Sequence, residues 1–194
     1  MGTLFGTDGI RGEANRPPVD GPTGFSLGRA LVRGLGYDDR NVRVVLGKDT
    51  RISGDMLESA VAAGIASAGG DVLRVDVLPT PGVAFLTRAL GADAGVMISA
   101  SHNPYQDNGF KIFSSRGTKL SVQEETSLEE GIHRDAGEGL PVKPTGDPGR
   151  IRLEKDACNR YIAFLQGNFP RDLTLKGVRM VLDTANGAAC QAAP

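Results

Sequence analysis

The sequence predicts an α/β protein built in layers, with parallel strand pairs joined through helices. Between residues 42 and 98, short β-branched apolar runs alternate with segments of helical spacing, in the order strand, helix, strand, helix, strand. Such connections are expected to be right-handed crossovers. The apolar fraction of 40% is sufficient for a packed core, and the 27 glycines are typical of many tight turns.

Local signals predict where the helices begin. Thr23 and Ser53 are expected to cap the first two helices, and Thr80 the third, with a proline directly after it. Ser121 and Glu124 form a capping box that opens a fourth helix. The predicted helices run over 23–35, 53–68, 80–90, 121–134 and 156–166, and the predicted strands over 42–46, 72–78, 94–98, 110–113 and 178–182.

The last part of the chain predicts a domain boundary. Residues 135–150 are rich in glycine and proline and are expected to form a surface connection. We therefore assign 1–150 to one domain and 151–194 to the incomplete start of a second, similar domain. One helix and one strand cannot bury their apolar faces alone, so we expect the chain to be an N-terminal fragment of a longer protein.

Composition excludes several partner classes. The net charge of −1 does not favour nucleic acid or an anionic membrane surface, and no apolar run approaches the length of a membrane span. Cys158 and Cys190 have neither metal-ligand spacing nor the density of a disulfide framework, which favours a reducing compartment. No signal peptide is visible. The expected location is the cytoplasm.

The most informative stretch follows the apolar run 94–98. It reads Ser-Ala-Ser-His-Asn-Pro over 99–104, so a buried strand is predicted to deliver serines to a loop. Ligands bind beyond the carboxyl ends of strands in α/β sheets, and Ser101 could be a phosphate-accepting nucleophile there. The alternative is a serine that only stabilises a turn. Ser99 is a nearby competitor.

Two further residues of this region could support the chemistry. Lys111 returns near the serine after the turn at Asn108 and Gly109, and could stabilise a phosphoryl group or transfer a proton. Its alternative is a solvated lysine on an edge strand. His102 could orient a phosphate or transfer a proton, or could be a hydrogen-bonded turn residue.

Basic residues also occur in two glycine-bearing loops. Arg11 and the loop over 6–12 could bind phosphate through backbone N–H groups and a guanidinium, or the loop could be a simple turn. Lys48 and Arg51 could line an anionic site, or pair with neighbouring acids. The loop 47–51 is not a Walker A motif, and no His/Cys/Asp cluster has metal-ligand spacing.

These loops together resemble a known family. The motifs Phe5-Gly-Thr-Asp-Gly-Ile-Arg-Gly12, Gly47-Lys-Asp-Thr-Arg-Ile-Ser-Gly54 and Ile98-Ser-Ala-Ser-His-Asn-Pro104, followed by Asp107-Asn-Gly-Phe-Lys111, occur in the order and spacing of the α-D-phosphohexomutase superfamily. The opening and serine motifs favour its glucosamine branch over the phosphoglucomutase/phosphomannomutase branch. The resemblance implies a mixed, mainly parallel sheet in three layers, with helices on both faces.

The resemblance also implies a function. The family's glucosamine branch interconverts glucosamine 6-phosphate and glucosamine 1-phosphate through a phosphoserine, supplying UDP-N-acetylglucosamine synthesis. Ser101 matches the phosphoserine, and Arg11, His102 and Lys111 match catalytic residues beside it. Residues expected to bind the substrate or its phosphate are Thr7, Lys48, Arg51 and Asn103. A sugar phosphate is the expected partner, and the resemblance allows a homodimer.

The same resemblance implies Mg²⁺, bound by the phosphate on Ser101 and by an Asp-rich loop that this sequence lacks. A hard divalent cation needs several oxygen ligands, so we expect an incomplete metal site and little or no mutase activity from this chain alone. A different sugar specificity within the superfamily and a non-catalytic binding module remain the alternatives.

Overall fold

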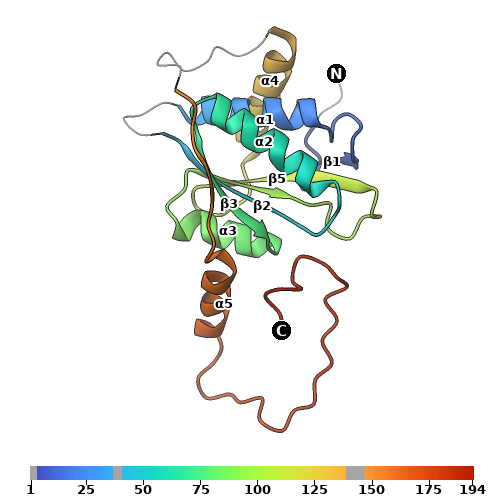
Figure 1. The fold of residues 1–194 in the computed structure, drawn as a ribbon, viewed down its shortest axis with the longest axis vertical. Coiled ribbons are helices and arrows are strands. Elements are labelled where there is room, and N and C mark those ends of the chain that lie inside the picture. Colours follow the sequence, from blue (N-terminus) through green and yellow to red (C-terminus); the bar gives the residue numbers. More distant parts are fainter. Residues whose placement is uncertain (1–3, 37–40, 139–146) are drawn as a thin grey trace.

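The computed structural model describes residues 4–36, 41–138 and 147–194, and over these residues it forms one sheet covered by helices on both faces (Figure 1). The strands are β1 (Ile10–Glu13), β2 (Arg43–Lys48), β3 (Asp71–Val77), β4 (Ala94–Ile98), β5 (Asp107–Ser114) and β6 (Ile151–Leu153). The helices are α1 (Gly21–Leu35), α2 (Gly54–Ser67), α3 (Thr80–Ala89), α4 (Val122–Glu138) and α5 (Ala157–Gly167).

The sheet is mixed and mainly parallel, as predicted. Its strand order is β1-β5-β4-β2-β3-β6. The pairs among β4, β2, β3 and β6 are parallel, whereas β5 and β1 join antiparallel at one edge. Lys48 at the end of β2 lies opposite Ile98 at the end of β4. The loops that follow these two central strands therefore meet beyond the carboxyl ends of the parallel strands, where ligand sites of α/β proteins usually form.

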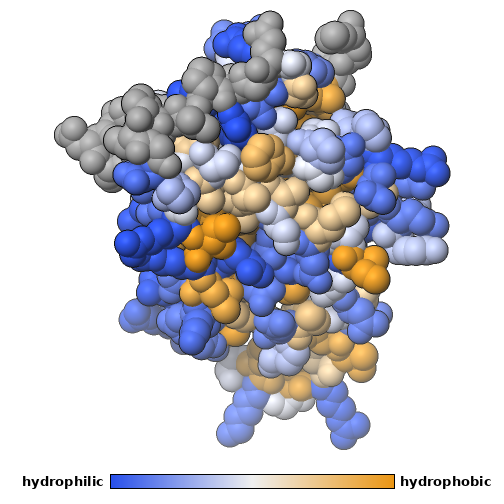
Figure 2. All heavy atoms as spheres, turned by 45° about the horizontal axis from the view of Figure 1, so that its top comes forward, coloured by the Kyte–Doolittle hydropathy of each residue, from blue (hydrophilic) through white to orange (hydrophobic). Residues whose placement is uncertain are grey.

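Alternating side chains feed two hydrophobic clusters. On β2, Val44 and Leu46 pack into the cluster beneath α1, α2 and α4, while Val45 packs into the cluster beneath α3 and α5. Figure 1 shows α1, α2 and α4 on one side of the sheet and α3 on the other. This is the predicted arrangement of three layers. On the face seen in Figure 2, hydrophobic residues form small groups separated by hydrophilic ones, which is ordinary for a protein surface.

Two predicted helix caps are wrong, one by three residues and one by a single residue. Helix α1 begins at Gly21 and its N-cap is Asp20, whose carboxylate accepts from the backbone N–H of Thr23 at 2.9 Å. Thr23 is thus the residue that is capped. Helix α3 includes Thr80, and Pro79 is its N-cap. The capping box is confirmed, because Glu124 Oε2 accepts from Ser121 N–H at 2.7 Å and Ser121 Oγ accepts from Glu124 N–H at 3.3 Å.

The strand predicted over 178–182 does not form. Residues 168–194 have no regular structure. They loop out beyond α5 and turn back toward the sheet (Figure 1), where the carbonyl oxygen of Asn186 accepts from Thr50 Oγ1 at 2.7 Å, while Val181 is 97% exposed. No strand of the described residues pairs with this segment, so its backbone N–H and C=O groups gain nothing from an extended conformation.

The boundary predicted at residue 150 stays a prediction. β6 directly follows that position and pairs in parallel with β3, as the last strand of the first sheet. Helix α5 packs on α3, with the rings of Phe85 and Phe164 stacked at 4.1 Å between centroids. The predicted surface connection over 135–150 lies partly outside the described residues, because α4 extends to Glu138 and the description resumes at residue 147.

Candidate active site at the serine loop

Ser101 lies on the loop that follows β4, with its side chain exposed. Its φ is 60°, a left-handed conformation that costs a residue other than glycine about 1–2 kcal/mol. Such a conformation persists only where the surroundings hold it in place. Ser101 Oγ lies 3.4 Å from His102 Nδ1. The loop therefore presents an exposed hydroxyl next to an imidazole, beyond the carboxyl ends of β2 and β4, where the loops of these two strands meet.

Ser99 has a different environment from Ser101. It is 4% exposed, its hydroxyl donates to Asp49 Oδ2 at 2.7 Å, and its oxygen accepts from the backbone N–H of Ser101 at 3.0 Å. Both hydrogen-bonding capacities of this hydroxyl are used within the protein. The geometry thus favours Ser101 over its competitor as the serine that a substrate can reach.

Arg51, in the loop after β2, is hydrogen-bonded to the loop between β4 and β5, here called the serine loop. Its guanidinium donates to four backbone carbonyl oxygens of that loop at 2.5–3.0 Å, and its Nε donates to Asp49 Oδ2 at 3.1 Å. The four carbonyls belong to Ser101, Asn103, Pro104 and Asp107. An arginine has five N–H donors, so this side chain is saturated.

Arg11 and Lys111 meet at one carboxylate. β1 pairs with β5 so that Arg11 lies opposite Gly109, and Phe110 and Ile112 both enter the core beneath α1, which leaves Lys111 on the other face of the sheet. Asp8 pairs with Arg11, and its Oδ2 lies 3.0 Å from Lys111 Nζ.

Asp8 is a site residue that the sequence reasoning missed. The hydrogen bond from Lys111 is the main cause that lowers the pKa of Asp8 below its ordinary value of 3.8, and Arg11 adds to it against the effect of burial. A signal was present, since this is the one acid in the glycine-bounded loop that also carries Arg11. Arg11 Nε is buried and has no hydrogen-bond partner among the described residues.

Of the other predicted phosphate ligands, two are bonded to acidic side chains of the protein and one is exposed. Lys48 is 7% exposed and pairs with Glu58 at 2.7 Å and Asp55 at 2.8 Å. Burial lowers the pKa of Lys48, but its bonds to Asp55 and Glu58 outweigh burial and raise that pKa above 10.5. Thr7 is exposed and Asn103 Nδ2 donates to Asp107 Oδ2 at 2.9 Å.

The structure therefore brings Ser101, His102 and Asn103 together in one loop, and Arg51 beneath it. Lys48 instead forms ion pairs with Asp55 and Glu58, which do not belong to this loop. The predicted contacts of Thr7, Lys48, Arg51 and Asn103 with phosphate stay predictions.

The described residues do not make a magnesium site by themselves. No group of three or more His, Cys, Asp or Glu side chains that could hold a metal occurs among them. Asp49 and Asp107, the acids nearest the loop in sequence and hydrogen bonding, are engaged by Arg51, Ser99 and Asn103. Ser101 offers one oxygen, fewer than Mg²⁺ takes.

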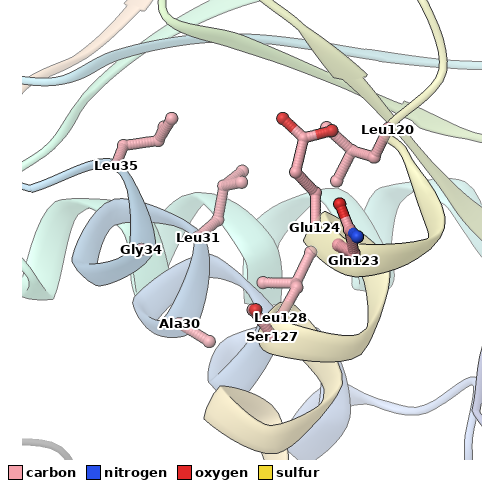
Figure 3. A pocket seen from close by; sticks show the side chains of 9 residues that line it. All are labelled: Ala30, Leu31, Gly34, Leu35, Leu120, Gln123, Glu124, Ser127 and Leu128. Atoms are coloured by element: carbon pink, nitrogen blue, oxygen red, sulfur yellow. The ribbon is translucent and has the colours of Figure 1, made fainter.

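A cavity of about 330 Å³ lies between α1 and α4, away from this chemistry (Figure 3). Leu31, Leu35 and Leu128 point into it, and its one acid, Glu124, is occupied by the capping box. Its lining includes one hydroxyl, that of Ser127, but no cationic side chain that could pair with a phosphate, so it does not compete with the serine loop as a phosphate site.

Fold and site together define an α/β/α domain that presents a serine and paired cations at one edge of its sheet. The chain belongs to the phosphoglucomutase/phosphomannomutase family, because residues 2–138 match that family's α/β/α domain I. This confirms the resemblance seen in the motifs.

Individual relatives agree with this assignment. The chain is 52% identical over 194 residues to a phosphoglucosamine mutase of Syntrophobacter fumaroxidans, with 100% of the chain and 43% of the relative covered. It is 53% identical over 197 residues to a phosphoglucosamine mutase of Moorella thermoacetica, with the same coverage. A solved putative phosphomannomutase from Thermus thermophilus matches with a TM-score of 0.69 and 29% identity, over 89% of this chain and 36% of that one.

The chain spans about 43% of the length of the curated relatives it matches. Among the described helices, none combines the length and the apolar character needed to cross a bilayer.

Proposed function

We propose that the chain carries the phosphoryl-transferring serine of an enzyme that interconverts glucosamine 6-phosphate and glucosamine 1-phosphate. The observation that carries the proposal is the contrast between the two serines of the loop. Ser101 is exposed, and its backbone has a left-handed conformation. The hydroxyl of Ser99, in contrast, is buried and makes two hydrogen bonds within the protein. The names of the relatives at 52% and 53% identity support the glucosamine substrate.

The reaction balances as two phosphoryl transfers. In the first, the bond between phosphorus and Ser101 Oγ breaks while phosphorus bonds to O1 of glucosamine 6-phosphate, and the proton of O1 ends on Ser101 Oγ. The product is a bisphosphorylated sugar. In the second transfer, the bond between phosphorus and O6 breaks while phosphorus bonds to Ser101 Oγ, the proton of Oγ ends on O6, and glucosamine 1-phosphate leaves. The serine is phosphorylated again at the end of each cycle.

The chain's own residues have roles in this scheme. Positive charge near the transferring group stabilises the charge that its oxygens carry in the transition state. Lys111 on β5 and Arg11 on the neighbouring edge strand β1 supply such charge, and Asp8 pairs with both cations on the same face of the sheet. His102, with Nδ1 3.4 Å from Ser101 Oγ, is placed to bond the serine oxygen or its phosphate.

The wider setting is part of the same proposal. The product would feed the synthesis of UDP-N-acetylglucosamine, and the enzyme would work in the cytoplasm on a sugar phosphate, with Mg²⁺ held mainly by residues outside this chain. A homodimer is compatible with this setting.

A second candidate is the glucose or mannose branch of the family. It is supported by the fold of the Thermus thermophilus protein, a putative phosphomannomutase, but at the lower identity of 29%. The third candidate is a binding module without catalysis.

The test uses a protein in which this chain is extended to the length of its curated relatives, here called the full-length protein. It is offered three substrates separately, and each reaction is followed by ³¹P NMR: glucosamine 6-phosphate, glucose 6-phosphate and mannose 6-phosphate. We expect the highest kcat/KM with glucosamine 6-phosphate. Ser101→Ala should lower kcat by about 1,000-fold or more, because the covalent carrier is lost. Ser115→Ala, on an exposed turn, is the matched control. Preference for glucose or mannose 6-phosphate would overturn the sugar assignment, and no turnover of any of the three would favour the binding module.

A further inference from the structure

Arg51 was expected to bind a phosphate, but its surroundings point to another role. The side chain is 11% exposed, and its five donors all bond to protein oxygens. A phosphate oxygen would have to displace one of these bonds. The bonds to the serine loop all end on backbone carbonyls, so they fix the path of the chain and not the direction of any one side chain.

We propose that Arg51 is a positioning residue, which holds Ser101 in the conformation from which it exchanges its phosphoryl group. This inference rests on the proposed function of Ser101. The loop bends around the guanidinium, which bonds the carbonyl of Ser101 itself at 3.0 Å and that of Asn103 at 2.8 Å. The hydrogen bond to its carbonyl oxygen helps to keep Ser101 at a φ of 60°. A serine without such contacts would favour a negative φ.

Asp49 ties the two ends of this arrangement together. Its Oδ1 accepts from the backbone N–H of Arg51 at 3.1 Å, and its Oδ2 accepts from both Arg51 Nε at 3.1 Å and Ser99 Oγ at 2.7 Å. Ser99 Oγ in turn accepts from the N–H of Ser101 at 3.0 Å. The N–H and the C=O of Ser101 are therefore both linked to one carboxylate, through Ser99 on one side and Arg51 on the other.

A lysine cannot reproduce this geometry. Its ammonium has three donors at a single point, whereas the planar guanidinium spreads five donors over two directions and reaches carbonyls on both sides of the loop. A change from Arg51 to lysine keeps the charge and loses the bonds. It therefore separates a role in positioning from a role in simple electrostatic attraction of phosphate.

The experiment measures single-turnover transfer of phosphate to Ser101 in the full-length protein, with glucosamine 1,6-bisphosphate and glucose 1,6-bisphosphate as separate donors. The variants are Arg51→Lys and Arg51→Ala, the latter with and without added guanidinium, and the matched control is Arg88→Ala at an exposed position on α3. Transfer rate, KM and melting temperature are recorded for each.

We expect Arg51→Lys and Arg51→Ala to lower the transfer rate by about 100-fold, the cost of a misplacement near 1 Å, with KM within about threefold of wild type. Guanidinium should restore part of the rate to Arg51→Ala but not to Arg51→Lys, where the ammonium fills the space. A role limited to folding stability would lower the melting temperature without a response to guanidinium, and would overturn the inference. So would a raised KM with an unchanged rate, which is the signature of a phosphate ligand.

Asp49→Asn keeps the test decisive if the Arg51 variants do not fold. The asparagine amide keeps one oxygen that can accept from Ser99 or Arg51, but it lacks the charged carboxylate that accepts from both. We therefore expect the same loss of transfer rate with an unchanged KM. An unchanged rate in folded Asp49→Asn would contradict the inference. If wild type gains no phosphate at Ser101 from either donor, the proposed function fails. If wild type and all variants gain it equally, only the role of Arg51 fails.

Discussion

At the scale of single residues, the charge balance around Asp8 is the most specific feature. This carboxylate pairs with both Arg11 and Lys111, the two cations proposed to act on the phosphoryl group. Without it, two like charges on neighbouring strands would repel each other. Asp8 thus keeps the cations together while no phosphate is present, and a phosphate on Ser101 would compete with it for them.

The pKa of Asp8 provides the first prediction. Titration by carboxyl ¹³C NMR should give a pKa for Asp8 below 3.8, and Lys111→Met should raise it more than Arg11→Met does, since the hydrogen bond from Lys111 is the largest cause. Because the folded pKa is lowered, Asp8 stabilises the fold above the unfolded value and loses that contribution as pH falls through the folded value. A destabilisation by Asp8→Asn that is equal at neutral and strongly acidic pH would contradict this account.

The sequence predicted Ser101, His102 and Lys111 because their positions after a strand and a turn are local signals. It could not predict what Arg51 does. That depends on β2 and β4 lying side by side in one register, which brings Asp49 beneath Ser99. Charge and loop context alone fit a phosphate ligand and a structural clamp equally well, and the tertiary contacts of Arg51 are what support the positioning role that we propose.

At the scale of elements, the contact between α1 and α2 explains several of the chain's helical glycines. A Cβ at Gly64 would lie 2.1 Å from the carbonyl oxygen of Phe25, and one at Gly28 would lie 2.5 Å from that of Val61. The two helix backbones therefore touch where these glycines face each other.

This contact gives the second prediction. Gly64→Ala should lower the free energy of unfolding by about 2–3 kcal/mol, because the added methyl group forces the helices apart. Gly34→Ala, the same change in α1 with nothing within 4 Å, should raise it by up to about 1 kcal/mol through helix propensity. Urea denaturation of both variants measures this. Equal effects of the two substitutions would show that the helices do not touch at Gly64.

The start of α1 gives the third prediction. Asp20→Ala should cost about 1 kcal/mol of stability, because the N–H of Thr23 loses its cap. Thr23→Ala should change stability by less than about 0.5 kcal/mol, since Thr23 lies inside the first turn and its side chain is not the cap. Thermal denaturation compares them. A larger loss from Thr23→Ala would support the cap that the sequence pattern suggested and would contradict the structure.

At the scale of the whole molecule, the sequence predicted the layers and the mixed sheet well, because strands and helices alternate without a break from β2 to β4. It failed over 178–182, where an apolar β-branched run was expected to form a strand. A strand is stable only beside another strand, and none of the described residues provides one. Local pattern is not sufficient where the structure depends on a partner.

The fourth prediction concerns activity. The 194-residue chain alone should show no measurable conversion of glucosamine 6-phosphate, whereas we expect the full-length protein to convert it. The chain covers about 43% of its relatives, and its described residues offer no group of metal ligands. A coupled assay for glucosamine 1-phosphate, with Mg²⁺ added and the phosphate on the chain verified by intact mass, tests this. Full turnover by the chain would contradict it.

The central claim is that Ser101 is the residue that carries phosphate, and its most direct test is the location of that phosphate. The full-length protein is isolated after incubation with glucosamine 1,6-bisphosphate, digested, and sequenced by tandem mass spectrometry across residues 94–119, which include both serines of the loop. The account predicts phosphate on Ser101 and none on Ser99. Phosphate on Ser99 or on another residue, with Ser101 unmodified in active protein, would contradict it.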